Sequence, residues 1–168
     1  MGMGAGDRIR YGLVTWFGLG LAPVAPGTFG TLGGVLLAVS FHAFLAPGML
    51  VPVLWGVSGA LLAYGCSLSA FTARVFPSKD PQAFVLDEVV GYLVTMALYA
   101  SFAGEPGPAA YAAGFLAFRA FDILKLQPAR RLEELPGALG IMADDVAAGV
   151  YSGIVLALGL PLVIPGPQ

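Results

Sequence analysis

The most constraining feature of this sequence is the distance between its charges. Residues 11–73 contain no Asp, Glu, Lys or Arg, and three further uncharged segments follow at 89–104, 106–118 and 146–168. A bilayer core about 30 Å thick needs roughly 20 apolar residues in a helix. The first segment is therefore long enough for two crossings, broken near Pro47, and the last for one. Helices are expected because a bilayer offers no water to unpaired backbone groups.

The composition favours the same class of fold. The chain has 168 residues, is 58% hydrophobic and only 11% charged, and carries a net charge of -2. Soluble domains typically carry about 25% charged residues, and the small net charge gives no reason to expect a nucleic-acid partner. We expect an all-α, polytopic helical membrane protein with a Gly/Pro-rich loop near the N-terminus, as a single domain over 1–168. A very hydrophobic soluble helical protein is the alternative. About five membrane-embedded helices are expected, approximately at 32–46, 50–73, 88–104, 108–121 and 146–164.

The basic residues predict an orientation. Arg8 and Arg10 precede the first crossing, Arg74 and Lys79 follow the second, and Arg119, Lys125, Arg130 and Arg131 follow the fourth. By the positive-inside tendency, the N-terminus, 74–87 and 119–145 are cytoplasmic, and the C-terminus lies outside. The N-terminal segment is expected to be retained, because residues 22–26 are a poor signal-peptide cleavage site and the apolar region continues past them.

Two isolated residues are not expected to form a site. Cys66 excludes an internal disulfide framework and is expected to be a small buried apolar residue. His42, the single histidine, lies within the first crossing and is expected to be a packed or interfacial residue.

The acidic residues gather where predicted helices begin or end. Asp87 and Glu88 start one apolar segment, Asp144 and Asp145 precede another, and Asp122 lies between Arg119 and Lys125 in FRAFDILK. Residues three apart share one stripe of a helix. Taken singly, each acid has a structural alternative, as a helix cap or half of a salt bridge. Taken together, five carboxylates and two cations at the cytoplasmic ends of membrane helices indicate a functional site.

The residue types indicate a metal and phosphate chemistry. Oxygen ligands without His or Cys suit Mg²⁺. Arginine and lysine bind phosphate, and Mg²⁺ bridges carboxylates to phosphate oxygens. The segment PGTFGT at 26–31 precedes an apolar helix expected to start near Leu32, and its glycines and the hydroxyls of Thr28 and Thr31 suit an anion. A simple helix-breaking turn is the alternative there.

Four separated motifs, in order, carry a family resemblance. PGTFGT, LDEVVG, FRAFDILK and GALGIMADDVAAG, within roughly residues 12–160, make the chain similar to the phosphatidylglycerophosphatase A family. The resemblance implies a helical membrane enzyme of phospholipid biosynthesis that uses Mg²⁺ to hydrolyse phosphatidylglycerophosphate to phosphatidylglycerol. Together with the orientation predicted from the basic residues, this leads us to expect a multi-pass protein of the bacterial plasma membrane with its active site facing the cytoplasm. The functional positions that the resemblance implies are Thr28, Asp87, Glu88, Arg119, Asp122, Lys125, Asp144 and Asp145.

The chain departs from the family pattern at two places. Residues 126–128 read Leu-Gln-Pro where the family commonly has Pro-Trp-Pro, and Gly137-Ala138 replaces a Gly-Gly pair. Every charged position is kept, so the departures concern the substrate loop more than the chemistry. An attacking water, with one acid of Asp87-Glu88 or Asp144-Asp145 as base, is the simplest mechanism. A phospho-aspartate intermediate stays open.

A cation or proton transporter is the alternative function. Acids in a membrane and a broken glycine-rich segment are also features of transporters. The position of the acids distinguishes the phosphatase from the transporter. A transporter needs acids near the bilayer midplane with access from both sides, whereas here the acids fall at predicted helix ends on one side of the membrane.

Overall fold

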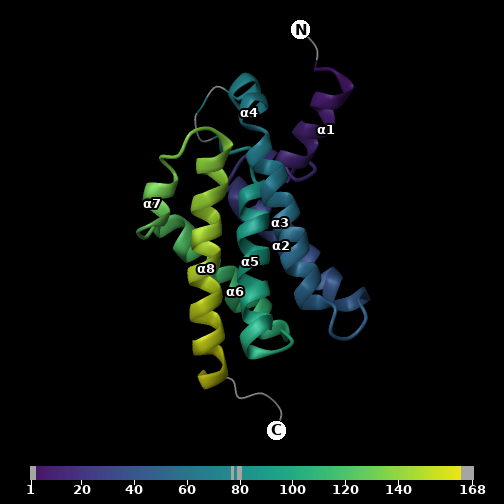
Figure 1. Ribbon diagram of the computed structural model, residues 1–168, viewed down its shortest axis with the longest axis vertical. Helices are drawn as coiled ribbons and strands as arrows, with labels where there is room; N and C mark the ends of the chain where they lie inside the picture. The colour runs from purple at the N-terminus through teal and green to yellow at the C-terminus, as the bar shows by residue number, and fades with distance from the viewer. Residues whose placement is uncertain (1–2, 77, 79–80, 164–168) are drawn as a thin grey trace.

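The computed structural model describes residues 3–76, 78 and 81–163, and every regular element among them is helical (Figure 1). The elements are α1 Ala5–Val14, the short 3-10 helix η1 Leu19–Leu21, α2 Pro26–Phe44, α3 Leu50–Ser67, α4 Ser69–Val75, α5 Leu86–Ala103, α6 Pro108–Leu124, α7 Ala129–Leu132 and α8 Ala138–Val163. Two residues used in the predictions lie outside the described residues: Lys79, and Ile164 at the end of the last predicted crossing.

The prediction of a helical membrane protein is confirmed. Among the residues that the structure describes, four helices are long and apolar enough to cross a bilayer: α2, α3, α5 and the Ala138–Leu160 part of α8. The predicted crossing 108–121 corresponds to α6, which at 17 residues is shorter than these four and carries Arg119 and Asp122 near its end. About 26 Å of helix is slightly less than the hydrocarbon thickness of a bilayer.

Three helix boundaries differ from the predicted crossings. α2 begins at Pro26 rather than near Leu32, because a proline fits the first helical position, where its missing N–H is not needed. The crossing predicted over 50–73 is divided at Leu68 into α3 and α4. α8 begins at Ala138 rather than at 146, so charged residues lie inside the helix instead of marking its start.

α5 is the central helix. Within the described residues, 72% of its span is buried, against 28% for α2 and 22% for α3, and it contacts α2, α3, α6 and α8. The fully buried side chains of Tyr92, Leu93 and Met96 pack there against Phe118 of α6. α2, α3, α6 and α8 therefore surround α5 and present their outer faces to lipid. Cys66 is half-buried at the end of α3, less enclosed than its sequence context predicts.

The chain path brings several helix ends to one level. α2, α5 and α8 run away from that level, and α3 and α6 return toward it, so α5 and α8 are parallel neighbours (Figure 1). The starts of α2 and α5, the end of α6 and the early turns of α8 lie together around one pocket. This arrangement places residues from four distant parts of the sequence in a single site.

Candidate active site

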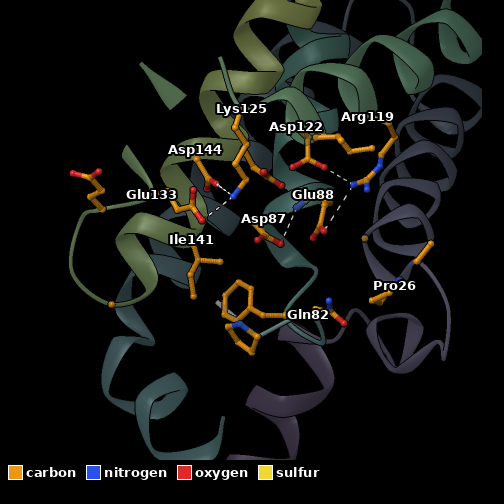
Figure 2. Close-up of a pocket in the computed structure, with 18 residues that line it drawn as sticks. Pro26, Gln82, Asp87, Glu88, Arg119, Asp122, Lys125, Glu133, Ile141 and Asp144 are labelled. Atoms are coloured by element: carbon orange, nitrogen blue, oxygen red, sulfur yellow. Dashed lines mark hydrogen bonds and ion pairs between the residues drawn. The ribbon is translucent and has the colours of Figure 1, made fainter. Parts of the chain in front are cut away.

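A pocket of about 560 Å³ lies where these four helices meet (Figure 2). Its charged lining residues are Asp87 and Glu88 of α5, Arg119 and Asp122 of α6, Lys125 after α6, Glu133 and Glu134 after α7, and Asp144 and Asp145 of α8. All five acids and both cations predicted from the sequence are therefore brought together. The start of α2 completes the wall with Pro26 and Gly27.

Three carboxylates form the centre of the pocket. One oxygen each from Asp87, Glu88 and Asp145 lies within 4.8 Å of the other two. Asp87 is 7% exposed and Asp145 only 4%, so water screens neither of them well. Like charges this close repel in a buried site, and a cation among them removes the repulsion.

Unpaired oxygens in the same cluster fit a bound metal ion. Among the described residues, Glu88 Oε2 and Asp145 Oδ2 are buried and have no hydrogen-bond partner. A buried acceptor without a donor costs free energy, typically about 1–3 kcal/mol. Because the donor set consists of carboxylate oxygens from two helices, it matches the ligands of hard divalent cations.

Arg119 lies on one side of the acid cluster. Its Nη1 pairs with Asp122, three residues further along α6, and lies 3.9 Å from Glu88 Oε1 (Figure 2). The sequence prediction that Arg119 and Asp122 share a helix stripe is thus confirmed. The guanidinium also bridges α6 to α5, which holds Glu88 close to the end of α6.

Lys125 lies on the other side of the cluster. It ends α6 in a left-handed backbone conformation, with φ of 45°, and its Nζ lies 3.0 Å from both Asp144 Oδ2 and Glu133 Oε1. Burial alone would lower the pKa of this amine, but the hydrogen bonds to Asp144 and Glu133 outweigh burial and raise the pKa. Lys125 therefore stays charged at neutral pH and neutralises the acids on that side.

The glycine-rich segment positions the acids by close packing. A Cβ on Gly27 would overlap Glu88 Oε1, and one on Gly30 would lie 2.6 Å from Val85 Cβ. Val85 N also donates a 2.8 Å hydrogen bond to Val14 O. The segment just before Asp87 is therefore held by the last residue of α1 and by the N-terminal part of α2. This packing explains why small residues recur in that segment.

The two threonines of PGTFGT lie outside the pocket lining. The hydroxyl of Thr31 is fully buried and donates a 2.9 Å hydrogen bond to Gly27 O within α2. Thr28, which is half-buried, donates its backbone N–H to Ala25 O. From this segment the pocket takes Pro26 and Gly27 instead, together with the preceding Ala25.

The position of Asp144 and Asp145 within α8 excludes a capping role. The helix starts at Ala138, so these acids lie six and seven residues past its first position. A cap acts on the unpaired N–H groups of the first turn. Their side chains instead enter the pocket, where Asp144 binds Lys125 and Asp145 joins the central cluster. Asp87 is different, since its Oδ1 accepts a 2.9 Å hydrogen bond from the Glu88 backbone N–H in the first turn of α5.

Sequence analysis missed Glu133 as a member of the site. Glu133 is a direct partner of Lys125, but it belongs to the charged run RRLEE, where nothing in the pattern separates it from solvent-exposed residues. Gly27 was indicated only through its motif and not as a contact of Glu88.

Comparisons with known proteins place the chain among named relatives. The family model described as Phosphatidylglycerophosphatase A matches residues 12–160, which contain every pocket residue named above. A Haemophilus influenzae protein named Phosphatidylglycerophosphatase A is 37% identical over 145 residues, covering 86% of this chain and 84% of that protein. The Escherichia coli protein of the same name is 31% identical over 153 residues, covering 88% and 81%.

A third relative has a different name. A Bacteroides thetaiotaomicron protein, provisionally named a phosphatidylinositol-3-phosphatase, is 36% identical over 147 residues, covering 86% of this chain and 89% of that protein. No solved structure matches the chain. Since the family model covers most of the sequence and its named relatives exceed 30% identity, the chain belongs to the phosphatidylglycerophosphatase A family.

Proposed function

We propose that the protein is a Mg²⁺-dependent lipid phosphatase that hydrolyses phosphatidylglycerophosphate to phosphatidylglycerol and phosphate. We place it in the bacterial plasma membrane, with its active site facing the cytoplasm, in phospholipid biosynthesis. One observation carries the proposal: three carboxylates, those of Asp87 and Asp145 buried and that of Glu88 partly buried, have oxygens within 4.8 Å of one another, flanked by two cations in a pocket at one end of membrane helices. The family and its relatives' names supply the substrate.

Asp87, Glu88 and Asp145 are the residues we propose to hold Mg²⁺, with Asp122 and Asp144 next to them. A bound Mg²⁺ supplies positive charge to the phosphate oxygens and lowers the pKa of water. The unpaired Glu88 Oε2 and Asp145 Oδ2 support this assignment, because both oxygens are buried and available as ligands.

Arg119 and Lys125 are proposed to bind the terminal phosphate of the substrate. Each now pairs with carboxylates that line the same pocket, Arg119 with Asp122 and Lys125 with Asp144 and Glu133. A phosphate group that enters between Arg119 and Lys125 can interact with both cations alongside these carboxylates. Arginine presents a planar fork suited to two phosphate oxygens, and lysine acts as a point charge.

One pocket carboxylate is proposed to act as the base. In direct hydrolysis, water attacks phosphorus, the carboxylate takes its proton, and the phosphorus–oxygen bond to the lipid breaks. The leaving alkoxide then takes a proton to give the lipid hydroxyl. In the second route, an aspartate oxygen attacks first and water hydrolyses the phospho-aspartate. Trapping labelled phosphate on the protein after an acid quench would distinguish the two routes.

The distribution of acids argues against the transporter alternative. Asp87 and Glu88 lie in the first turn of α5, Asp122 lies near the end of α6, and Asp145 is in an early turn of α8. All of them share one end of the helix bundle. A transport pathway would need ionisable groups or a cavity that can be reached from both sides of the bilayer.

The decisive experiment is phosphate release by the purified protein in detergent. We expect release from phosphatidylglycerophosphate with Mg²⁺ and none with a chelator, and loss of activity in Asp145→Asn. Asp7→Asn is the matched control, because Asp7 pairs with Arg74 away from the pocket. Preferred hydrolysis of phosphatidylinositol 3-phosphate would overturn the substrate assignment, and no release from either lipid would overturn the phosphatase proposal.

A further inference from the structure

A second cavity, of about 870 Å³, lies between α2 and α6. Most of its lining is apolar: Leu32, Val35, Val39 and Ala43 from α2, Pro108, Ala112, Phe115 and Leu116 from α6, and Pro106 from the preceding turn. Ala43 and Ala112 are exposed, so this groove opens on the outer surface of the bundle. In a bilayer that surface faces hydrocarbon.

The groove follows the same pair of helices as the catalytic pocket. On α2, Gly27 of the pocket lies five residues before Leu32, and on α6, Arg119 lies three residues after Leu116. At about 1.5 Å of rise per residue, roughly 5–8 Å of helix separates the two cavities. A molecule whose phosphate lies at Arg119 therefore has the groove directly next to it, along the same two helices.

The groove has the length of one acyl chain. From Leu32 to Ala43 it follows α2 for eleven residues, which is about 17 Å of helix. Half of a hydrocarbon core about 30 Å thick is about 15 Å, the depth reached by the chains of one leaflet. The match in length and polarity favours a hydrocarbon chain over a compact ligand.

A polar contact closes the far end of the groove. His42 Nδ1 lies 2.9 Å from the Tyr111 hydroxyl, and both residues line the cavity. His42 Nε2 also lies 4.0 Å from Glu105, beside a smaller cavity. Polar groups at this point make further extension of an apolar chain unfavourable. The groove thus runs from a phosphate pocket at one end to a polar stop at the other.

We propose that this groove binds one acyl chain of the lipid substrate while its phosphate occupies the catalytic pocket. This inference rests on the proposed function, because it takes the substrate to be a lipid phosphate. The chain would hold the headgroup at the level of Arg119 and so make the reaction depend on acyl length. Lining residues of both helices, and not the charged site alone, would then determine substrate preference.

Filling the groove tests this assignment. Ala112→Trp and Ala43→Trp add bulk from opposite walls without touching a charged pocket residue, and Ala63→Trp is the matched control at an exposed alanine of α3. Each is assayed with long-chain and with dihexanoyl phosphatidylglycerophosphate. We expect kcat/KM to fall about tenfold or more on the long-chain lipid in both groove variants, with little change on the short-chain lipid. Ala63→Trp should resemble the wild type on both.

Photo-cross-linking measures lipid binding in the groove independently of enzymatic activity. Wild-type protein in nanodiscs is irradiated with phosphatidylglycerophosphate carrying a diazirine near the end of one chain, and with phosphatidylcholine carrying the same chain. Cross-links to α2 and α6 that form with the phosphate lipid and weaken in Ala112→Trp support the proposal. Equal cross-linking by both lipids would identify bulk lipid and overturn it, as would an equal loss of activity on both chain lengths.

Two remaining outcomes are also distinguishable. If a groove variant changes the oligomeric state by size-exclusion chromatography with light scattering, the groove is a contact between copies and the proposal is wrong. If the wild type hydrolyses neither chain length, the proposed function fails. The cross-linking experiment then still tests whether the groove binds an acyl chain, because selective labelling requires only that the phosphate lipid binds there.

Discussion

Gly149 of α8 packs against the carbonyl oxygen of Gly91 of α5 so closely that a Cβ on Gly149 would overlap it. A Cβ on Gly91 would likewise lie 2.7 Å from Asp145 O. Each glycine follows an acid of the carboxylate cluster by four residues, Gly91 after Asp87 and Gly149 after Asp145. Positions four apart share one face of a helix. The glycine contact therefore sets the separation of the two helices that carry the cluster.

Gly149→Ala is expected to separate α5 from α8 and to disturb the carboxylate cluster one turn away. We expect a loss of about 1–3 kcal/mol of stability, as for overpacked cores, together with a marked loss of phosphate release. Thermal unfolding in detergent and the phosphate assay measure the two effects. Gly159→Ala is the control, because nothing lies within 4 Å of a Cβ there. Equal behaviour of the two variants would contradict this role of Gly149.

Arg119→Lys is expected to raise KM and lower kcat, with kcat/KM reduced about tenfold or more. Lysine keeps the charge but cannot present two parallel N–H groups to the phosphate. Arg74→Lys serves as the control, since Arg74 pairs with Asp7 outside the pocket. An unchanged kcat/KM would make Arg119 a structural partner of Asp122 and Glu88 only.

Asp144→Asn and Asp145→Asn are each expected to reduce phosphate release more than about a hundredfold while the protein still folds. Mg²⁺ binding to the folded state should raise the melting temperature of the wild type, and Asp145→Asn should lose most of this rise. Differential scanning fluorimetry with Mg²⁺ and with chelator gives this readout independently of activity. A full Mg²⁺-dependent rise in Asp145→Asn would place the metal elsewhere.

Lys125 is expected to stabilise the fold at neutral pH and to lose that effect in strongly alkaline solution. Its pKa is raised in the folded protein, so its contribution is complete below the unfolded value of about 10.4 and is lost as pH rises through the folded value. The difference in unfolding free energy between wild type and Lys125→Met should therefore be constant from pH 6 to about 9 and shrink above about 10. A difference that vanished at neutral pH would show that the contacts with Asp144 and Glu133 contribute nothing.

The orientation of the protein can be read with topology reporters. A reporter after residue 168 is expected at the outer face, and one in the 74–87 loop in the cytoplasm, because basic residues cluster on the site's side of the bundle. Finding both reporters on the same face would contradict the predicted number of crossings. α6 would then be the first crossing to reject, because it is the shortest of them.

The sequence alone predicted the composition of the site better than its geometry. Asp122, Lys125 and the two acid pairs were identified because charges are rare in this chain, so each one is conspicuous. The start of α8 was not predicted, since the acids looked like a helix boundary although their side chains enter a cavity. Glu133 and the Gly91–Gly149 contact depend on tertiary packing, which leaves no local periodic signal.

The order of the helices along the chain has a consequence for biogenesis. The pocket draws on α2, α5, α6 and α8, and α8 is synthesised after the other three. Until α8 enters the membrane, Lys125 lacks Asp144 and the cluster lacks Asp145. A ribosome-bound chain ending before α8 therefore lacks one of the three clustered carboxylates, and the pocket is completed only by the last insertion event. Before that event Lys125 keeps Glu133 as a partner and Arg119 keeps Asp122, so the two cations are held in place before the last acids arrive.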